Sequence, residues 1–139
     1  VRRKPSPLAL LQIHSLSLIV VQDMTAKTQS PLTVYYDGAC PVCSREIGFY
    51  AKRTGGTVSY CDVAAEACPA PDLDREQALQ RFHVRLSDGT LVSGAAAFLA
   101  LWRQTPGFRL PARLLSARPI VAALDVAYGG FLKIRRAWR

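Results

Sequence analysis

The chain has 139 residues, of which 50% are hydrophobic and 20% charged, and its formal net charge is +8. This length suits one domain, and the hydrophobic share is enough for a core, which excludes an intrinsically disordered protein. No apolar run reaches the roughly 18–20 residues of a membrane-spanning helix. The positive charge lies at the two ends, since residues 32–100 carry six basic and eight acidic side chains. No RNA-binding signature or zinc-finger spacing accompanies it, so we expect no nucleic-acid partner.

Residues 1–31 are predicted to be an N-terminal extension, and residues 32–139 to form the domain. The extension has a basic start and an apolar stretch over residues 8–21, a pattern that resembles a secretory signal peptide. Met24 is the only methionine, so translation from Met24 is an alternative interpretation, and an ordered extra element is a third. We expect a cytoplasmic protein, or an exported one if the extension is a true signal.

The first elements of the domain are predicted to form a strand–helix–strand unit. Residues 32–36 are a β-branched and aromatic run, typical of a buried strand. From Pro41 the apolar spacing becomes helical, and Gly55-Gly56 ends the helix. Residues 57–61 then read as a second strand. Such a unit normally places its two strands parallel, with a right-handed crossover.

The second half of the domain is predicted to add a hairpin and helices. An Asp-Gly turn at Asp88-Gly89 separates two short apolar runs and indicates the hairpin. The further predicted elements are a helix over 74–81, strands over 82–86 and from 91, and helices over 94–102, 110–117 and 119–136. The order βαβ, α, ββα predicts an α/β, thioredoxin-like fold with a four-stranded mixed sheet. The last two helices are additions to that fold.

Cys40 and Cys43 form a Cys-x-x-Cys pair at the predicted start of the first helix. Exposed N–H groups and a partial positive charge at a helix N-terminus stabilise a thiolate, which is the nucleophile in disulfide exchange. We therefore expect Cys40 to attack a substrate and Cys43, one turn on, to resolve the mixed disulfide. Pro41 suits the first helical turn, where no backbone donor is needed. The pair predicts a redox-active dithiol that needs no cofactor.

Asp37 and Gly38 precede the pair, and Asp37 is a candidate site residue. A carboxylate that touches Cys40 would disfavour its thiolate, so Asp37 assists only if it faces Cys43 and accepts its proton, or caps the loop. A turn aspartate without a catalytic role is the alternative. Gly38 is expected to supply a backbone angle that other residues resist.

Cys61, Cys68 and His83 have weaker functional signals. Cys61 is expected to be a small core residue, Cys68 to be exposed in a loop and His83 to be structural. The four cysteines together allow a competing interpretation, a metal site. Their spacing is loose for a zinc ribbon, so we expect no metal ligands here, and a non-enzymatic metal-binding or partner-binding module remains the alternative function.

The predicted last helix combines basic and apolar side chains. Phe131, Ile134 and Trp138 lie beside four basic residues, Lys133, Arg135, Arg136 and Arg139. Such a helix can attract an anionic membrane surface. We expect at most weak membrane contact, as a property accessory to the main function.

Two blocks of the sequence resemble the DCC family of thiol–disulfide oxidoreductases. The family signature Asp-x-x-Cys-x-x-Cys matches Asp37, Cys40 and Cys43, and residues 81–98 resemble a second block of the family. The likeness runs from about residue 32 to the C-terminus. It implies a thioredoxin-like fold and redox activity through the two cysteines.

The resemblance implies a protein-disulfide or thiol–disulfide oxidoreductase, with a thiol or disulfide substrate and a second redox partner. We expect a monomer. Ordinary thioredoxins place a cis-proline just before the third strand, but this chain has no proline between Pro71 and Pro106. Substrate docking beside the dithiol is therefore expected to differ from that of thioredoxin.

Overall fold

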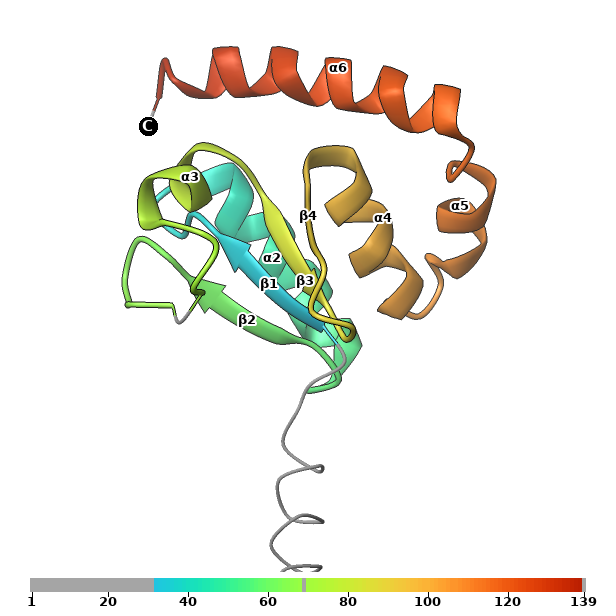
Figure 1. The fold of residues 1–139 in the computed structure, drawn as a ribbon, viewed down its shortest axis with the longest axis horizontal. Helices are drawn as coiled ribbons and strands as arrows, with labels where there is room; N and C mark the ends of the chain where they lie inside the picture. Colours follow the sequence, from blue (N-terminus) through green and yellow to red (C-terminus); the bar gives the residue numbers. More distant parts are fainter. Residues whose placement is uncertain (1–31, 69, 139) are drawn as a thin grey trace, which may run out of the picture.

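The structure is a computed structural model that describes residues 32–68 and 70–138. The predicted extension, residues 1–31, lies outside the described residues. Nine helices and strands follow in the described part of the chain (Figure 1). They are β1 (Leu32–Tyr36), α2 (Pro41–Thr54), β2 (Ser59–Asp62), α3 (Arg75–Gln80), β3 (His83–Leu86), β4 (Leu91–Ser93), α4 (Gly94–Gln104), α5 (Arg109–Leu114) and α6 (Arg118–Arg135).

The four strands form one mixed sheet in the order β2-β1-β3-β4. β1 runs parallel to β2, with Val34 opposite Tyr60, and antiparallel to β3, with Val34 opposite Val84. β3 and β4 form the hairpin that the Asp-Gly turn predicts. This topology is consistent with a thioredoxin-like fold and confirms the predicted fold class.

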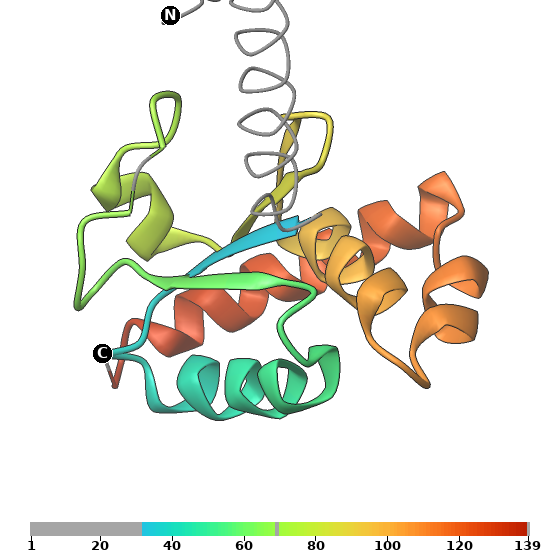
Figure 2. The ribbon, with the colours of Figure 1, turned by 90° about the horizontal axis from the view of Figure 1, so that it is seen from below.

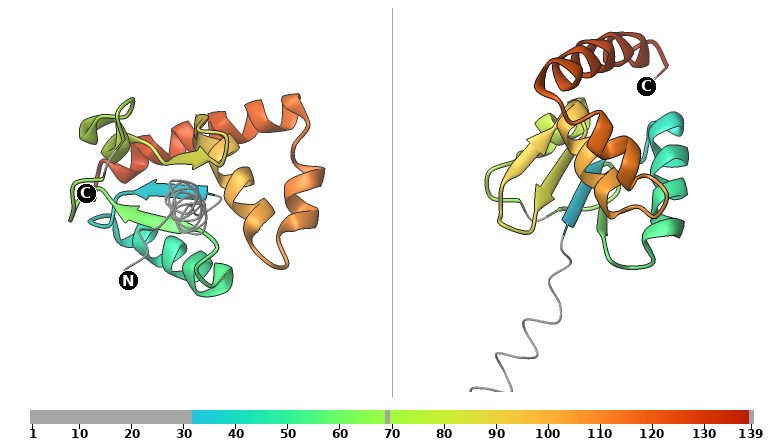
Figure 3. Two further views of the ribbon diagram at one scale, coloured as in Figure 1. Left: turned by 60° about the horizontal axis from the view of Figure 1, so that its bottom comes forward. Right: turned by 90° about the vertical axis from the view of Figure 1, so that its right-hand side faces the viewer.

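The strand period places alternate residues on two faces of the sheet, and each face has its own core. Val34 of β1 packs with Ile47 and Tyr50 of α2 and with Leu101 of α4. Tyr35, the next residue, packs on the opposite face with α3. Figures 2 and 3 show α2 along one face of β1 and β2, with α3 on the other side. β1 is therefore covered by helices on both faces, and the chain leaves it directly into the loop before α2.

The two C-terminal helices return the chain to the start of α2. α5 turns it, and α6 packs against α4 and ends beside α3 and the amino end of α2 (Figures 1 and 3). On the way, the Tyr128 hydroxyl of α6 accepts the Phe82 backbone N–H at 3.0 Å. Phe82 directly precedes β3, where thioredoxins have their proline, so α6 covers this segment. No described helix is long and apolar enough to cross a membrane.

Candidate functional site

The two cysteines of the dithiol lie at the amino end of α2, as the sequence predicts. Cys40 is the N-cap residue, Pro41 follows in the first turn, and both thiols are reduced. The Cys43 backbone N–H donates to Cys40 Sγ at 3.4 Å. A sulfur in this position receives the positive end of the helix dipole. Cys40 has 0% exposed surface, whereas Cys43 is half-buried.

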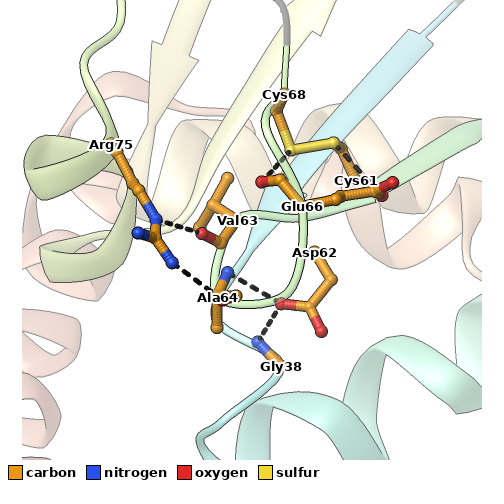
Figure 4. Close-up of a disulfide and its surroundings, with 8 residues drawn as sticks. All are labelled: Gly38, Cys61, Asp62, Val63, Ala64, Glu66, Cys68 and Arg75. Atoms are coloured by element: carbon orange, nitrogen blue, oxygen red, sulfur yellow. Dashed lines mark hydrogen bonds between the residues drawn. A yellow bond between two sulfur atoms is a disulfide. The ribbon is translucent and has the colours of Figure 1, made fainter.

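Two backbone contacts hold the loop that leads into α2. The Gly38 N–H donates to Asp62 Oδ1 at 2.9 Å (Figure 4). The Ser44 hydroxyl donates to the Gly38 carbonyl oxygen at 2.6 Å. A Cβ on Gly38 would come within 1.8 Å of Asp62 Oδ2. The expected special backbone angle is wrong, because Gly38 does not have a positive φ. Glycine is required here because the carboxylate approaches the backbone closely.

Arg135, at the end of α6, reaches the dithiol across 92 positions of sequence. Its Nη1 lies 3.6 Å from Cys43 Sγ and 3.9 Å from Asp37 Oδ2. Its Nη2 donates to the carbonyl oxygens of Leu79, at 2.6 Å, and Gln80, at 3.3 Å. The residue is only 6% exposed, so these contacts replace water around its charge. Sequence reasoning placed Arg135 in a surface patch, and no local signal distinguished it from its basic neighbours.

Asp37 is buried, at 3% exposure, and lies between the motif loop and Arg135. Its Oδ1 accepts the Ala39 backbone N–H at 3.2 Å, and its Oδ2 faces Arg135. The carboxylate therefore caps the loop and also neutralises the buried guanidinium. Arg135 in turn bridges Asp37 and Cys43, so the structure brings together all three candidate site residues of the sequence motif.

The Cys43 thiol has a strongly perturbed ionisation. Burial, followed by the hydrogen bond with Cys40, raises its pKa to about 11, although the Arg135 guanidinium acts in the opposite direction. A thiol with this pKa stays protonated at neutral pH. The site thus places one sulfur at the helix N-terminus beside a second sulfur that keeps its proton.

Two hollows lie along the first turns of α2, and Cys43 lines the smaller one. A small cavity of about 20 Å³ is lined by Cys43, Asp37 and Arg135, and by Glu46 from the next turn of α2. A larger groove of about 300 Å³ has walls from α2, α4 and α6, and Val42 and Glu46 line it on the α2 side. The remaining lining of the groove is mostly aromatic and aliphatic. Glu46 borders both hollows, and sequence reasoning did not single it out.

Cys61 and Cys68 form a disulfide, with their Cα atoms 6.0 Å apart (Figure 4). The expectation of a core Cys61 and an exposed Cys68 is therefore wrong, since both residues are half-buried and bonded to each other. The cysteines divide into two separate pairs, so they do not form the four-thiol metal site that was the competing interpretation. Glu66 lies near the disulfide sulfurs, but bonded sulfurs are not thiolate ligands.

His83 and the exposed basic residues of the C-terminal segment take no part in the contacts described above for the dithiol. His83 Nδ1 contacts the Arg81 carbonyl oxygen at 2.7 Å, and burial lowers the pKa of its ring. This is the geometry of a structural histidine. In the predicted membrane-facing patch, Lys133 and Arg136 are exposed and Arg139 lies outside the described residues, but the buried Arg135 is not available to a membrane surface.

Comparisons with known proteins agree with the motif. The family model of DCC1-like thiol–disulfide oxidoreductases matches residues 34–139. An uncharacterised chloroplastic protein of Arabidopsis thaliana is 29% identical over 109 residues, which cover 75% of this chain and 50% of that protein. The chain therefore spans about half the length of this curated relative. No solved structure matches. The dithiol at the helix start and the family match over most of the chain establish that it belongs to the DCC1-like thiol–disulfide oxidoreductase family.

Proposed function

We propose that the protein exchanges thiols and disulfides with Cys40 as the attacking thiol and Cys43 as the resolving thiol. The difference between the two sulfurs supports this assignment. Cys40 Sγ accepts a backbone N–H at the helix N-terminus and faces the positive end of the helix dipole. Cys43 has a pKa of about 11, so its thiol is almost entirely protonated at pH 7.

The reaction starts when the Cys40 thiolate attacks one sulfur of a substrate disulfide. A bond forms between Cys40 and that sulfur, and the other substrate sulfur leaves as a thiolate and takes up a proton. Cys43 then loses its proton and attacks Cys40, which closes the Cys40–Cys43 disulfide and releases the second substrate thiol. Two electrons pass to the substrate, and a thiol-containing redox partner returns the dithiol to its reduced state. The same steps in reverse would oxidise a substrate.

Arg135 and Asp37 act on the resolving thiol in this proposal. When Cys43 loses its proton, the negative charge forms 3.6 Å from the Arg135 guanidinium, which stabilises it. Asp37 holds Arg135 in place from the other side, at 3.9 Å. Asp37 therefore assists by positioning the arginine and capping the loop, not by withdrawing the Cys43 proton itself.

Access to Cys40 is a separate requirement, because its exposed fraction is 0%. A protein disulfide can reach it only after a local opening of the surrounding residues. We expect this opening to break the hydrogen bonds by which Arg135 ties the end of α6 to α3 and to Cys43. Attack of Cys40 on a large protein disulfide is therefore expected to be slower than its attack on a small disulfide.

The test is to trap the intermediate. A Cys43→Ser variant that reacts with a peptide disulfide should accumulate a mixed disulfide at Cys40, detected by non-reducing mass spectrometry and peptide mapping. Cys40→Ser is the matched control and should trap much less. If both variants trap the peptide equally, or if only Cys40→Ser traps it, the assignment of roles is wrong.

A further inference from the structure

Glu46 is an acidic residue placed one helical turn beyond the resolving thiol. It follows Cys43 by three positions on α2, a spacing that puts both side chains on one face of the helix. Both residues line the same cavity of about 20 Å³. A cavity of that size has room for one water molecule, provided that polar groups surround it. A single water can therefore form hydrogen bonds with both the Glu46 carboxylate and the Cys43 thiol.

The cavity offers several polar groups to such a water. Besides Cys43 and Glu46, the titratable or charged side chains that line it are Tyr36, Asp37, Arg81, Tyr128 and Arg135. They come from the end of β1, the loop after it, the C-cap of α3 and α6, whereas α4 contributes only the apolar Phe98. Cys40 contacts Cys43 directly from the other side. A water in this cavity can thus satisfy the two to four hydrogen bonds that buried waters make.

Two carboxylates line the cavity, and their partners distinguish them. Asp37 is already engaged, since its Oδ2 faces the Arg135 guanidinium and its Oδ1 accepts the Ala39 backbone N–H. Glu46 has no cation among its hydrogen-bond partners: Tyr50 donates to it at 3.2 Å, and burial raises the pKa of its carboxyl group. A carboxylate with a higher proton affinity is the stronger base. Glu46 is therefore the carboxylate suited to accept a proton, while Asp37 stays paired with Arg135.

We propose that Glu46 accepts the Cys43 proton through one cavity water while Cys43 attacks the mixed disulfide at Cys40. The inference rests on the proposed function, because it assigns a residue to its second step. The water passes a proton to the Glu46 carboxylate and takes one from the Cys43 thiol. The Cys43–Cys40 bond forms, the Cys40–substrate bond breaks, and the substrate leaves as a thiolate.

The surroundings of Glu46 also provide an exit for the proton. Glu46 lines the larger groove as well as the small cavity, so the protonated carboxyl group can release its proton to the groove or to the departing thiolate. Trp102 Nε1 donates to the Tyr50 hydroxyl at 2.8 Å, and Tyr50 donates to Glu46. This chain of hydrogen bonds fixes the carboxylate between the two hollows. Glu46 is a positioning and proton-relay residue, since it acts on Cys43 through water.

The two steps can be separated by stopped-flow absorbance, with the reduced full-length chain and the chromogenic disulfide dithiobis(nitrobenzoic acid). Attack by Cys40 releases the first coloured thiolate at a rate proportional to reagent concentration. Resolution by Cys43 releases the second at a rate independent of concentration. Glu46→Gln is the test variant because it keeps the size and an oxygen that accepts the Tyr50 bond. Glu76→Gln, on the exposed surface of α3, is the matched control.

The expected result is a change in the second phase alone. At pH 7 we expect Glu46→Gln to slow resolution by about a hundredfold, within the usual range for a general base, and to leave the first phase and the Glu76→Gln control unchanged. The difference should shrink as the pH approaches the Cys43 pKa of about 11, where the thiol ionises without help. Glu46→Asp, which retains a carboxylate, should depend less on pH than Glu46→Gln does.

Two outcomes would overturn the inference. One is a second phase that Glu46→Gln does not slow at pH 7. The other is slowing by the same factor at every pH, which is what a purely structural defect would cause. Failure of the proposed function looks different: the concentration-dependent first phase would then persist in Cys40→Ser, whatever residue occupies position 46.

Discussion

Replacement of Arg135 by glutamine should destabilise the fold strongly, because it leaves a buried carboxylate without its cation. Arg135 Nη1 and Asp37 Oδ2 lie 3.9 Å apart, with side-chain exposures of 7% and 1%. At an effective dielectric constant of about 20 this separation corresponds to about 4 kcal/mol of Coulomb attraction. Loss of one partner of a buried pair generally costs about 3–5 kcal/mol. We expect Arg135→Gln to lower the free energy of unfolding by that amount.

The measurement is urea unfolding at pH 7, and a double-mutant cycle with Asp37→Asn identifies the cause. In the natural chain Asp37→Asn should destabilise, because Arg135 then lacks its counter-ion. In the Arg135→Gln background it should stabilise, because it removes the uncompensated charge. Arg136→Gln, at an exposed position next in sequence, should stay within about 0.5 kcal/mol of the natural chain.

The reasoning would be refuted by either of two results. A loss below about 1 kcal/mol for Arg135→Gln would mean that water replaces the guanidinium at little cost. An equal effect of Asp37→Asn in both backgrounds would mean that the two charges are not coupled.

Three further predictions follow from the same region. Gly38→Ala should lower the free energy of urea unfolding by about 1–3 kcal/mol, because its Cβ would come within 1.8 Å of a carboxylate oxygen. Gly48→Ala is the control and should stabilise α2, because open space surrounds Gly48. Equal effects of the two substitutions would contradict this reasoning. Replacement of both Cys61 and Cys68 by serine should cost about 2–3 kcal/mol without reductant, from the entropy of the short closed loop, and the difference should vanish once reductant has opened the disulfide. The rate at which iodoacetamide alkylates Cys43, measured by peptide mass spectrometry, should rise with pH through an apparent pKa of about 11, because burial disfavours the thiolate. A midpoint below the ordinary thiol pKa of 9.0 would contradict the environment described for Cys43.

Local sequence patterns were sufficient to predict the elements that carry the dithiol. The β-branched run of residues 32–36 predicted β1, Pro41 and the glycines at 55 and 56 predicted the ends of α2, and Asp88-Gly89 predicted the hairpin. These signals act over a few residues, so they depend little on the rest of the fold. The position of Cys40 at a helix N-terminus, and hence the expectation of redox chemistry, followed from them.

The tertiary structure decided which distant groups surround the dithiol. Arg135 lies beside Cys43 only because α6 returns across α4, and nothing in its own segment distinguishes it from exposed Arg136. Glu46 is spaced for the same helix face as Cys43, but only the packing of α6 against that face closes the cavity they share. The partner of Cys61 likewise depended on the path of the loop after β2. Periodicity reports which face of an element is buried, whereas the identity of the buried charges depends on contacts between residues far apart in sequence, which short-range patterns do not encode.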